Sequence, residues 1–402
     1  MTTTDSIGAT GPATPLTDRY GVPVDANKGD QFSSYDVDAF EVPSHSDEIW
    51  RFTPLKRLRG VHDGSAVAAT GSLTTHVEEQ PGVRVESVPM DDPRVGEAGA
   101  PRDRVAAQAY CSTESATVLT VAAETEVEGR VLVTVDGPGE GLLAYGHLQI
   151  RLEPFARATV VVDQRGSGTV AENVEFVVGD SARLEVVCVQ DWADDAVHLA
   201  GHHLVTGRDA TIVYTGVTFG GELVRVCPVA RFAAPGGDIT LNGLYFADDG
   251  QHLEHRLLVD HAVPNCRSEI MYKGALQGDP ESDLPDAHTV WIGDVLIRAE
   301  AEGTDTYELN RNLLLTDGAR ADSVPNLEIE TGEIVGAGHA SATGRFDEEH
   351  LFYLQSRGIP EDAARRLVVR GFFGEIIARI GVPEVRERLT QAVEDELERS
   401  GV

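Results

Sequence analysis

The sequence predicts a mainly β protein built as a right-handed parallel β-helix, with a small mixed segment before it and a helical segment after it. Three observations predict this arrangement. Short apolar runs rich in β-branched residues fill the middle of the chain. A turn-containing pattern recurs there at intervals of 28 and 29 residues. Helical periodicity begins only after Gly344.

The N-terminal part is predicted to form a tail and a small mixed domain. Residues 1–30 are rich in Thr, Gly, Pro, Ala and Asp without periodicity, which is typical of a disordered tail. In residues 31–110 we expect a helical turn that presents Trp50 to a core, a strand at Val83–Val88 and a short helix beginning at Asp103. These elements predict an N-terminal α/β domain.

Residues 111–345 carry the repeat and are predicted to form the β-helix core. Ala182, Ala210 and Ile239 occupy equivalent positions in three copies of one pattern of turn, small, polar and apolar residues. A period in the twenties is typical of a solenoid whose coils stack on one another. A β-sandwich is the alternative, because it also has many short strands but need not keep the period. The lack of long helical patterns between the strands argues against a doubly wound α/β sheet.

Residues 346–402 are predicted to be helical. Pro360 stands where a helix start favours proline, with acidic residues behind it. Phe372, Phe373 and Ile376 belong to a wide apolar stripe on the following helix. So wide a stripe predicts two packing surfaces, one within the chain and one for a partner. The alternative is a helix that is sandwiched within its own domain.

The composition limits the kinds of partner. The 402 residues carry a net charge of −33, which argues against binding to nucleic acid or an anionic membrane, because phosphate contacts need clustered Lys and Arg. The hydrophobic content of 41% is enough for a well-developed core. No run of 18 apolar residues occurs, and the four cysteines are widely spaced without a CxxC pair. We therefore expect a reduced chain in the cytoplasm, without a membrane span.

Three catalytic motifs are missing from the sequence. No G-x4-G-K-[ST] phosphate loop, no G-x-S-x-G nucleophile turn and no H-E-x-x-H zinc motif occurs. We therefore expect a protein that is not an enzyme, so that any ATP hydrolysis linked to its function would come from a partner.

His339 is the candidate functional residue. It lies among small residues between Gly336 and Gly344, whose backbone a second surface can approach closely. The alternative is a histidine in a turn that water satisfies. Other histidines could be drawn as metal ligands, but their spacing means little on strands and turns, so we interpret them as structural. These are His198, His202 and His203, and His252, His255 and His261.

Several separated motifs carry a family resemblance over roughly residues 45–380. They are Glu48-Ile-Trp-Arg-Phe-Thr-Pro54, Asp260-His-Ala-Val-Pro264, Tyr272-Lys-Gly274, Leu313-Leu-Leu315, Pro325-Asn-Leu-Glu-Ile329, Gly338-His-Ala-Ser-Ala-Thr-Gly344 and Leu351-Phe-Tyr-Leu-Gln-Ser-Arg-Gly-Ile359. In this order they resemble the SufB/SufD family, the scaffold subunits of the SUF iron–sulfur cluster assembly machinery.

The resemblance implies a parallel β-helix fold and a set of partners. It implies a heterodimer with a SufB-like subunit, and docking of the ATPase SufC on the helical region at about residues 346–395, where Phe372, Phe373 and Ile376 are candidates. It places His339 at a site shared with the SufB-like subunit, where the imidazole can bind iron beside a cysteine of the partner. An iron–sulfur cluster would reside there transiently, and a flavin could take part through the complex.

One departure from the family pattern decides between its members. Many of them carry a cysteine two residues before the motif histidine, where this chain has Ala337. The missing thiolate removes a natural cluster ligand and favours a SufD role over a SufB role. A SufB-like subunit or a homodimer remains as an alternative. A β-helix enzyme that acts on polysaccharide is another, and it rests on fold analogy alone.

Overall fold

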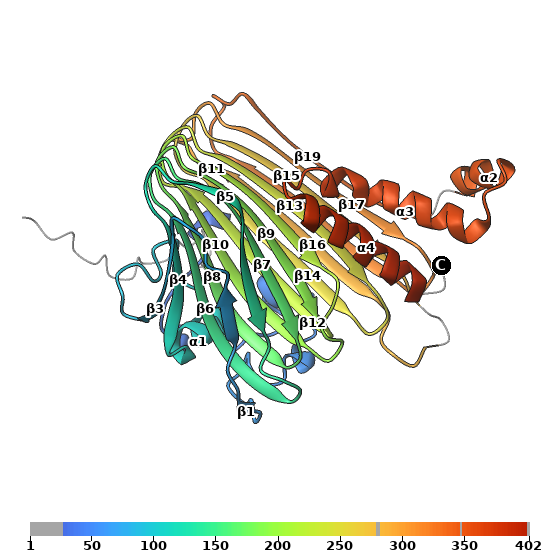
Figure 1. The fold of residues 1–402 in the computed structure, drawn as a ribbon, viewed down its shortest axis with the longest axis horizontal. Helices are drawn as coiled ribbons and strands as arrows, with labels where there is room; N and C mark the ends of the chain where they lie inside the picture. The colour runs from blue at the N-terminus through green and yellow to red at the C-terminus, as the bar shows by residue number, and fades with distance from the viewer. Residues whose placement is uncertain (1–26, 279–281, 346–347, 400–402) are drawn as a thin grey trace, which may run out of the picture.

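The computed structural model describes residues 27–278, 282–345 and 348–399. The central part of the chain winds into a parallel β-solenoid, in which two sheets face each other around one core (Figure 1). From β4 onward, even-numbered strands pair in the first sheet and odd-numbered strands pair in the second. The predicted parallel β-helix is confirmed, and the β-sandwich alternative is wrong.

The strands of the solenoid are mostly ten residues long. The first sheet contains β4 (Ser115–Val121), β6 (Leu142–Leu152), β8 (Thr169–Val178), β10 (Val197–Thr206), β12 (Leu223–Phe232), β14 (His252–His261), β16 (His288–Ile297) and β18 (Arg320–Ile329). The second sheet contains β5 (Glu126–Asp136), β7 (Arg157–Gly166), β9 (Arg183–Trp192), β11 (Thr211–Thr218), β13 (Asp238–Ala247), β15 (Arg267–Leu276), β17 (Asp305–Leu314) and β19 (Gly336–Arg345).

Side chains on each strand alternate between the core and the outside. Leu184, Ile212 and Ile239 stack on successive rungs of the second sheet and are fully buried in the core. The predicted repeat places Ile239 in the position equivalent to Ala210. In the structure Ile239 pairs with Ile212, two residues further along, so the third copy of the repeat is corrected. Because side chains alternate with a period of two, the two-residue slip keeps Ile239 on the same face.

Every coil before β19 turns at a residue with left-handed backbone, two positions before a second-sheet strand. The φ angle is 57° at Ser181, 52° at Asp209 and 58° at Asn265, and the equivalent positions in the other coils are Glu124, Phe155, Gly236 and Gly303. Glycine, Asn and Asp adopt this conformation more readily than other residues. The repeated turn explains why successive coils superpose.

The N-terminal segment covers the outer face of the first sheet. Helix α1 (Arg104–Ser112) begins where it was predicted, because the Asp103 carboxylate accepts the backbone N–H of Ala106 at 2.8 Å. Trp50 is buried, as predicted, and the Arg225 guanidinium lies 4.0 Å from its ring centroid. The segment therefore shares a hydrophobic cluster with the solenoid. Its short 3-10 turns are Lys28–Asp30, Val37–Ala39, Glu48–Trp50 and Leu55–Leu58.

The predicted tail ends earlier than expected. The Arg298 guanidinium contacts the Asp30 carboxylate at 2.9 Å, and the Asn27 side-chain amide donates to Glu330 at 2.9 Å. Residues 27–30 therefore lie against the solenoid, which corrects the predicted boundary at residue 30. Residues 1–26 of that predicted tail lie outside the described part of the chain.

The two ends of the solenoid are different. At the first end, β2 (Thr74–Val77) and β3 (Val83–Pro89) pair antiparallel with β5 and β4, and β1 (Ala69–Thr70) pairs with β6. At the late end, β18 and β19 have a strand neighbour on one side only among the described residues. Both are less buried than the strands before them. The late end is therefore open.

Three helices follow the solenoid, as predicted: α2 (Glu348–Ser356), α3 (Glu361–Ile377) and α4 (Pro383–Arg399). Helices α3 and α4 lie across the outer face of the second sheet, and α2 stands away from it (Figure 1). Phe373 and Ile376 are fully buried in the cluster between these helices and the sheet, whereas Phe372 is partly buried. This burial corrects the assignment of Phe373 and Ile376 to a partner surface. Within the described part of the chain, no helix is long and apolar enough to span a membrane.

Candidate functional site

His339 lies at the open end of the solenoid. It is on β19, the last strand of the second sheet, in the register whose side chains face the interior. Because no further rung covers it among the described residues, its side chain is 45% exposed. The small neighbours Gly338 and Ala340 leave the ring accessible. The imidazole is therefore held on a strand and is accessible from the open end of the solenoid.

Glu308 lies directly beneath His339 on the preceding rung. The two residues are register partners on β17 and β19, and Glu308 Oε1 is 3.6 Å from His339 Nδ1. The Glu308 side chain is only 1% exposed, and neither carboxyl oxygen has a hydrogen-bond partner in the described structure. Burial, and then the nearby Asp294, raises the pKa of Glu308 to about 9. An unsatisfied buried carboxyl group costs stability.

The space for the Glu308 carboxyl group comes from a glycine. A Cβ at Gly293, on the facing β16 strand, would overlap Glu308 Oε2 and the ring of Trp291. Any larger residue at this position would therefore displace the carboxyl group.

Polar side chains form the rest of the open end. Ser341 on β19 and Ser323 on β18 share a hydrogen bond of 2.7 Å, and Ser323 donates to Asn310 Oδ1 at 2.7 Å. The Asn312 side-chain amide donates to Thr343 at 3.3 Å. Beside aliphatic neighbours such as Leu327 and Ala337, the last two rungs thus bring hydroxyl, amide, carboxyl and imidazole groups to the opening.

Sequence reasoning found His339 but missed Glu308 and its neighbours. The missed signal was the alternation of Glu308, Asn310 and Asn312 within one strand. Alternate positions on a strand share a face, so three polar residues on an inward face mark a functional or strained region. Recognising it required knowing which face was the inner one.

The other candidate histidines have neighbours either inside the solenoid or between the first sheet and the N-terminal segment. His198 contacts Glu172 at 2.8 Å, His202 contacts Tyr214 at 3.0 Å, and His255 contacts Thr218 at 3.1 Å. Burial lowers the pKa of His202 to about 3 and of His255 to about 4. The remaining contacts are His261 with Ser268, His252 with Glu254 and His288, and His203 packed beside Gly99. In the described ranges, no group of three His, Cys, Asp or Glu residues is arranged to hold a metal ion.

The cysteines lie away from the open end and are mostly buried. Cys188 and Cys266 are 1% exposed, and burial raises the pKa of both thiols. Burial also raises the pKa of Cys227 to about 12. Cys111, on α1, is exposed. Neutral buried thiols are poor nucleophiles and metal ligands.

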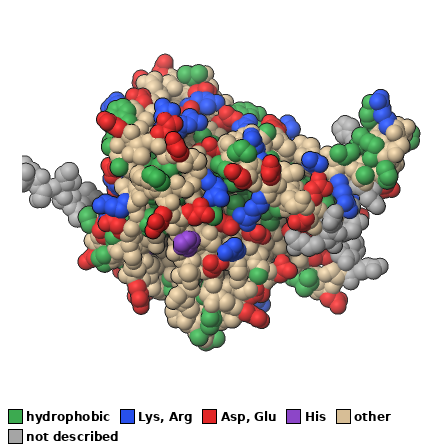
Figure 2. All heavy atoms as spheres, viewed as in Figure 1, with side chains coloured by type: hydrophobic (Ala, Val, Ile, Leu, Met, Phe, Trp, Pro, Cys, Tyr) green, Lys and Arg blue, Asp and Glu red, His purple; other side chains and the backbone are tan. Residues whose placement is uncertain are grey.

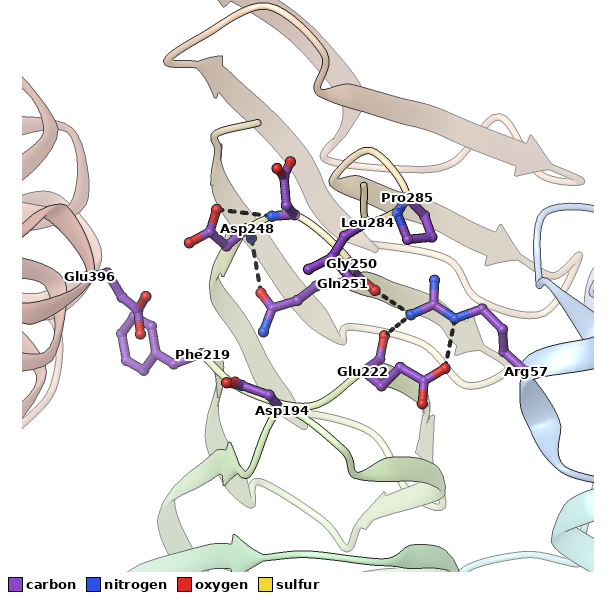
Figure 3. Close-up of a pocket in the computed structure, with 11 residues that line it drawn as sticks. Arg57, Asp194, Phe219, Glu222, Asp248, Gly250, Gln251, Leu284, Pro285 and Glu396 are labelled. Atoms are coloured by element: carbon purple, nitrogen blue, oxygen red, sulfur yellow. Dashed lines mark hydrogen bonds and ion pairs between the residues drawn. The ribbon is translucent and has the colours of Figure 1, made fainter. Parts of the chain in front are cut away.

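A pocket of about 610 Å³ lies elsewhere, between coil turns and the end of α4. Figure 3 shows its lining, in which Glu396 of α4 faces the loops that carry Asp194 and Asp248. The guanidinium of Arg57 is engaged by the carboxylate of Glu222 at 3.0 Å and by the backbone oxygen of Gly250. These contacts join the N-terminal segment to the coil turns, so the lining has a structural role.

Comparisons with known proteins agree with one another. A family model described as "SUF system FeS cluster assembly, SufBD core domain" matches residues 134–372. An iron–sulfur cluster assembly SufBD family protein of Mycobacterium tuberculosis is 68% identical over 372 residues, which cover 92% of this chain and 94% of that protein. One of Mycobacterium leprae is 64% identical over 371 residues, with the same coverage. A second SufBD family protein of M. tuberculosis is 26% identical over 225 residues, which cover 56% of this chain and 26% of that protein.

Proposed function

The chain belongs to the SufBD family of iron–sulfur cluster assembly proteins, and on that premise we propose that it is a SufD-like scaffold subunit without catalytic activity of its own. In this proposal the open end pairs with a SufB-like subunit. The C-terminal helices bind a SufC-like ATPase. His339 contributes an imidazole to a cluster-assembly site that the two solenoids share.

The open end carries the proposal. Two neighbouring ten-residue strands, β18 and β19, offer backbone N–H and C=O groups along one edge each. Long regular edge strands invite pairing with another chain, and proteins usually shorten, twist or cover them. At the first end this chain covers its edges with antiparallel strands of its own. A partner with the same architecture would cover the late end.

Ala337 supports the SufD-like role. It precedes the motif histidine by two residues, where a cysteine would supply a thiolate. Since none of the four cysteines lies on the last strands, β16 to β19, the protein thiolates for a cluster would have to come from the partner. The presence of two distinct SufBD family proteins in M. tuberculosis is consistent with a heteromeric pair.

Helix α2 supports the binding of a further partner. Phe352 is 72% exposed and Tyr353 is 54% exposed, on a helix that stands away from the solenoid. Figure 2 shows hydrophobic side chains gathered on this projecting part. Exposed apolar groups of this kind mark interaction surfaces. We assign the ATPase to α2 and the adjacent face of α3, where Leu367 is 47% exposed.

The substitution His339→Ala tests the shared site. The variant should fold and bind the SufB-like subunit normally. The ring is half exposed, and its contact with Glu308, at 3.6 Å, is too long for a hydrogen bond. It should lose most iron–sulfur cluster formation, since a nitrogen donor is removed. The measurement is the visible absorption of the cluster after anaerobic assembly in the purified three-protein complex.

His45→Ala is the matched control, because His45 is exposed on the N-terminal segment. Cluster assembly by the His339→Ala complex at the rate of the control would contradict the role of His339. The mass of the complex decides between the pairings. A stable species containing two copies of this chain and no SufB-like subunit would favour the homodimer.

A further inference from the structure

We propose that Glu308 is a second donor to iron at the open end, so that this chain contributes a carboxylate and an imidazole, Glu308 and His339, to one divalent ion. The inference rests on the proposed function, because it takes ferrous iron as the cargo at this end. It adds an oxygen ligand from one rung inside the solenoid. The argument depends on distance, burial and the chemistry of the two groups.

The distance fits two ligands of one ion better than it fits a hydrogen bond. Glu308 Oε1 and His339 Nδ1 are 3.6 Å apart, which is beyond hydrogen-bond range. Two donors that each lie about 2.1 Å from one metal ion are separated by about 3.0 to 3.5 Å at right or tetrahedral angles. A small side-chain rotation would bring both groups to one ion. Parallel pairing of β17 and β19 keeps them on the same side of the sheet.

The burial of Glu308 has no structural explanation. Native proteins pair their buried carboxyl groups, because an unsatisfied one costs free energy. Glu308 is buried, and neither of its oxygens has a hydrogen-bond donor in the described part of the chain, although Asn310 and Asn312 on the same face donate to other oxygen atoms. Three other deeply buried glutamates are paired: Glu172 with His198, Glu175 with His147, and Glu254 with Arg225. The Glu308 carboxyl group lies 3.6 Å from the half-exposed imidazole of His339 and has no donor among the described residues, so a cation that displaces its proton would satisfy it.

Glu308 and His339 supply only part of the coordination that a metal ion needs, and this limits the affinity of the chain for the ion. Imidazole nitrogen and carboxylate oxygen are common ligands of ferrous iron, but two of them leave at least two positions to be filled. The described residues hold no third His, Cys, Asp or Glu in a metal-binding group. The remaining ligands must therefore come from the SufB-like subunit or from the cargo itself. We expect weak binding by the chain alone and tighter binding in the complex.

Cobalt(II) tests this inference without reference to cluster assembly. Its visible absorption reports both binding and the ligands. The full-length chain, and its complex with the SufB-like subunit, would be titrated with Co²⁺ under anaerobic conditions at neutral pH. Glu308→Gln and His339→Ala should each weaken binding about tenfold or more and change the spectrum, because each removes a ligand. Glu308→Asp keeps the carboxylate but withdraws it, and should bind with intermediate affinity.

Glu333→Gln is the matched control, because Glu333 is exposed in the loop before β19 and its loss should leave the titration unchanged. If His339→Ala loses Co²⁺ and Glu308→Gln keeps wild-type affinity and spectrum, the inference is wrong and the proposed function stands. If neither substitution changes Co²⁺ binding, or no Co²⁺ binds to the chain or the complex, both the inference and the iron role of His339 are wrong. Urea unfolding of each variant shows that any loss is not caused by misfolding.

Discussion

Glu308 combines a cost in stability with a position at the open end. Its pKa is raised to about 9 by burial first and by Asp294 second, whereas a glutamate in the unfolded chain titrates near 4.3. Between these two values the folded chain holds a proton that the unfolded chain has released. The free energy of unfolding therefore falls as pH rises through this window.

Glu308→Gln should stabilise the protein at neutral and mildly alkaline pH. Glutamine has nearly the same shape as glutamate but does not ionise. The variant therefore avoids the loss of unfolding free energy that the wild type suffers as pH rises. Its advantage in unfolding free energy should be small near pH 4 and grow by up to about 1.4 kcal/mol per pH unit toward pH 8. Urea unfolding of both proteins from pH 4.5 to 8 measures it. A variant that is less stable than the wild type at every pH would indicate a structural role for the carboxyl group.

His339 and Glu308 differ in how far sequence could predict them. His339 was predicted because its motif and its small neighbours are contiguous in the chain. Glu308 lies 31 positions earlier, and only the pairing of β17 with β19 brings it beneath the ring. Register depends on coil lengths, and the two-residue slip at Ile239 shows how turns of unequal length shift it. Contacts between rungs were therefore beyond sequence reasoning.

The C-terminal helices have one face that packs on the solenoid and another that is exposed. Phe373 and Ile376 of α3 are fully buried against the second sheet, while Lys273 of β15 reaches the Glu375 carboxylate at 2.7 Å. Sequence periodicity predicted the wide stripe correctly, but it could not say which part the chain itself covers. The buried part holds α3 on the solenoid, which leaves α2 and the outer side of α3 for a partner.

Charging the exposed face of α2 should break the contact with the ATPase without unfolding the chain. A double substitution, Phe352→Glu with Tyr353→Glu, places charges where an apolar contact is proposed, and should weaken binding of the SufC-like ATPase about tenfold or more. Its effect on the free energy of unfolding should stay within about 0.5 kcal/mol, because both side chains are exposed. Affinity is measured by calorimetry with the purified ATPase.

Phe373→Ala is the matched contrast for this experiment. It removes a fully buried ring and should lower the free energy of unfolding by about 3 to 5 kcal/mol. ATPase affinity that is unchanged by the double substitution would show that the docking surface lies elsewhere on the chain.

Four histidines on the first sheet are buried and have lowered pKa values. Burial lowers the pKa of His202 to about 3, and those of His203, His255 and His261 to about 4. In the unfolded chain a histidine titrates near 6.5. Below pH 6.5 the unfolded chain therefore binds protons that the folded chain excludes. The free energy of unfolding should decrease as the pH is lowered from 6.5 to about 4.

Acid should unfold the protein well above the pH at which carboxylates protonate. Each of the four histidines can contribute up to about 1.4 kcal/mol per pH unit between pH 6.5 and 4, and a native domain has only about 5 to 15 kcal/mol in total. Urea midpoints measured at pH 7.5, 6.5, 5.5 and 4.5 should decrease steeply below 6.5. His255→Gln keeps a hydrogen-bonding group near Thr218 but cannot be protonated. It should reduce the dependence of the unfolding free energy on pH by the amount that corresponds to one bound proton. A midpoint that stays level from pH 6.5 to 4.5 would mean that the buried histidines accept protons as readily as they do in the unfolded chain, which would contradict this prediction.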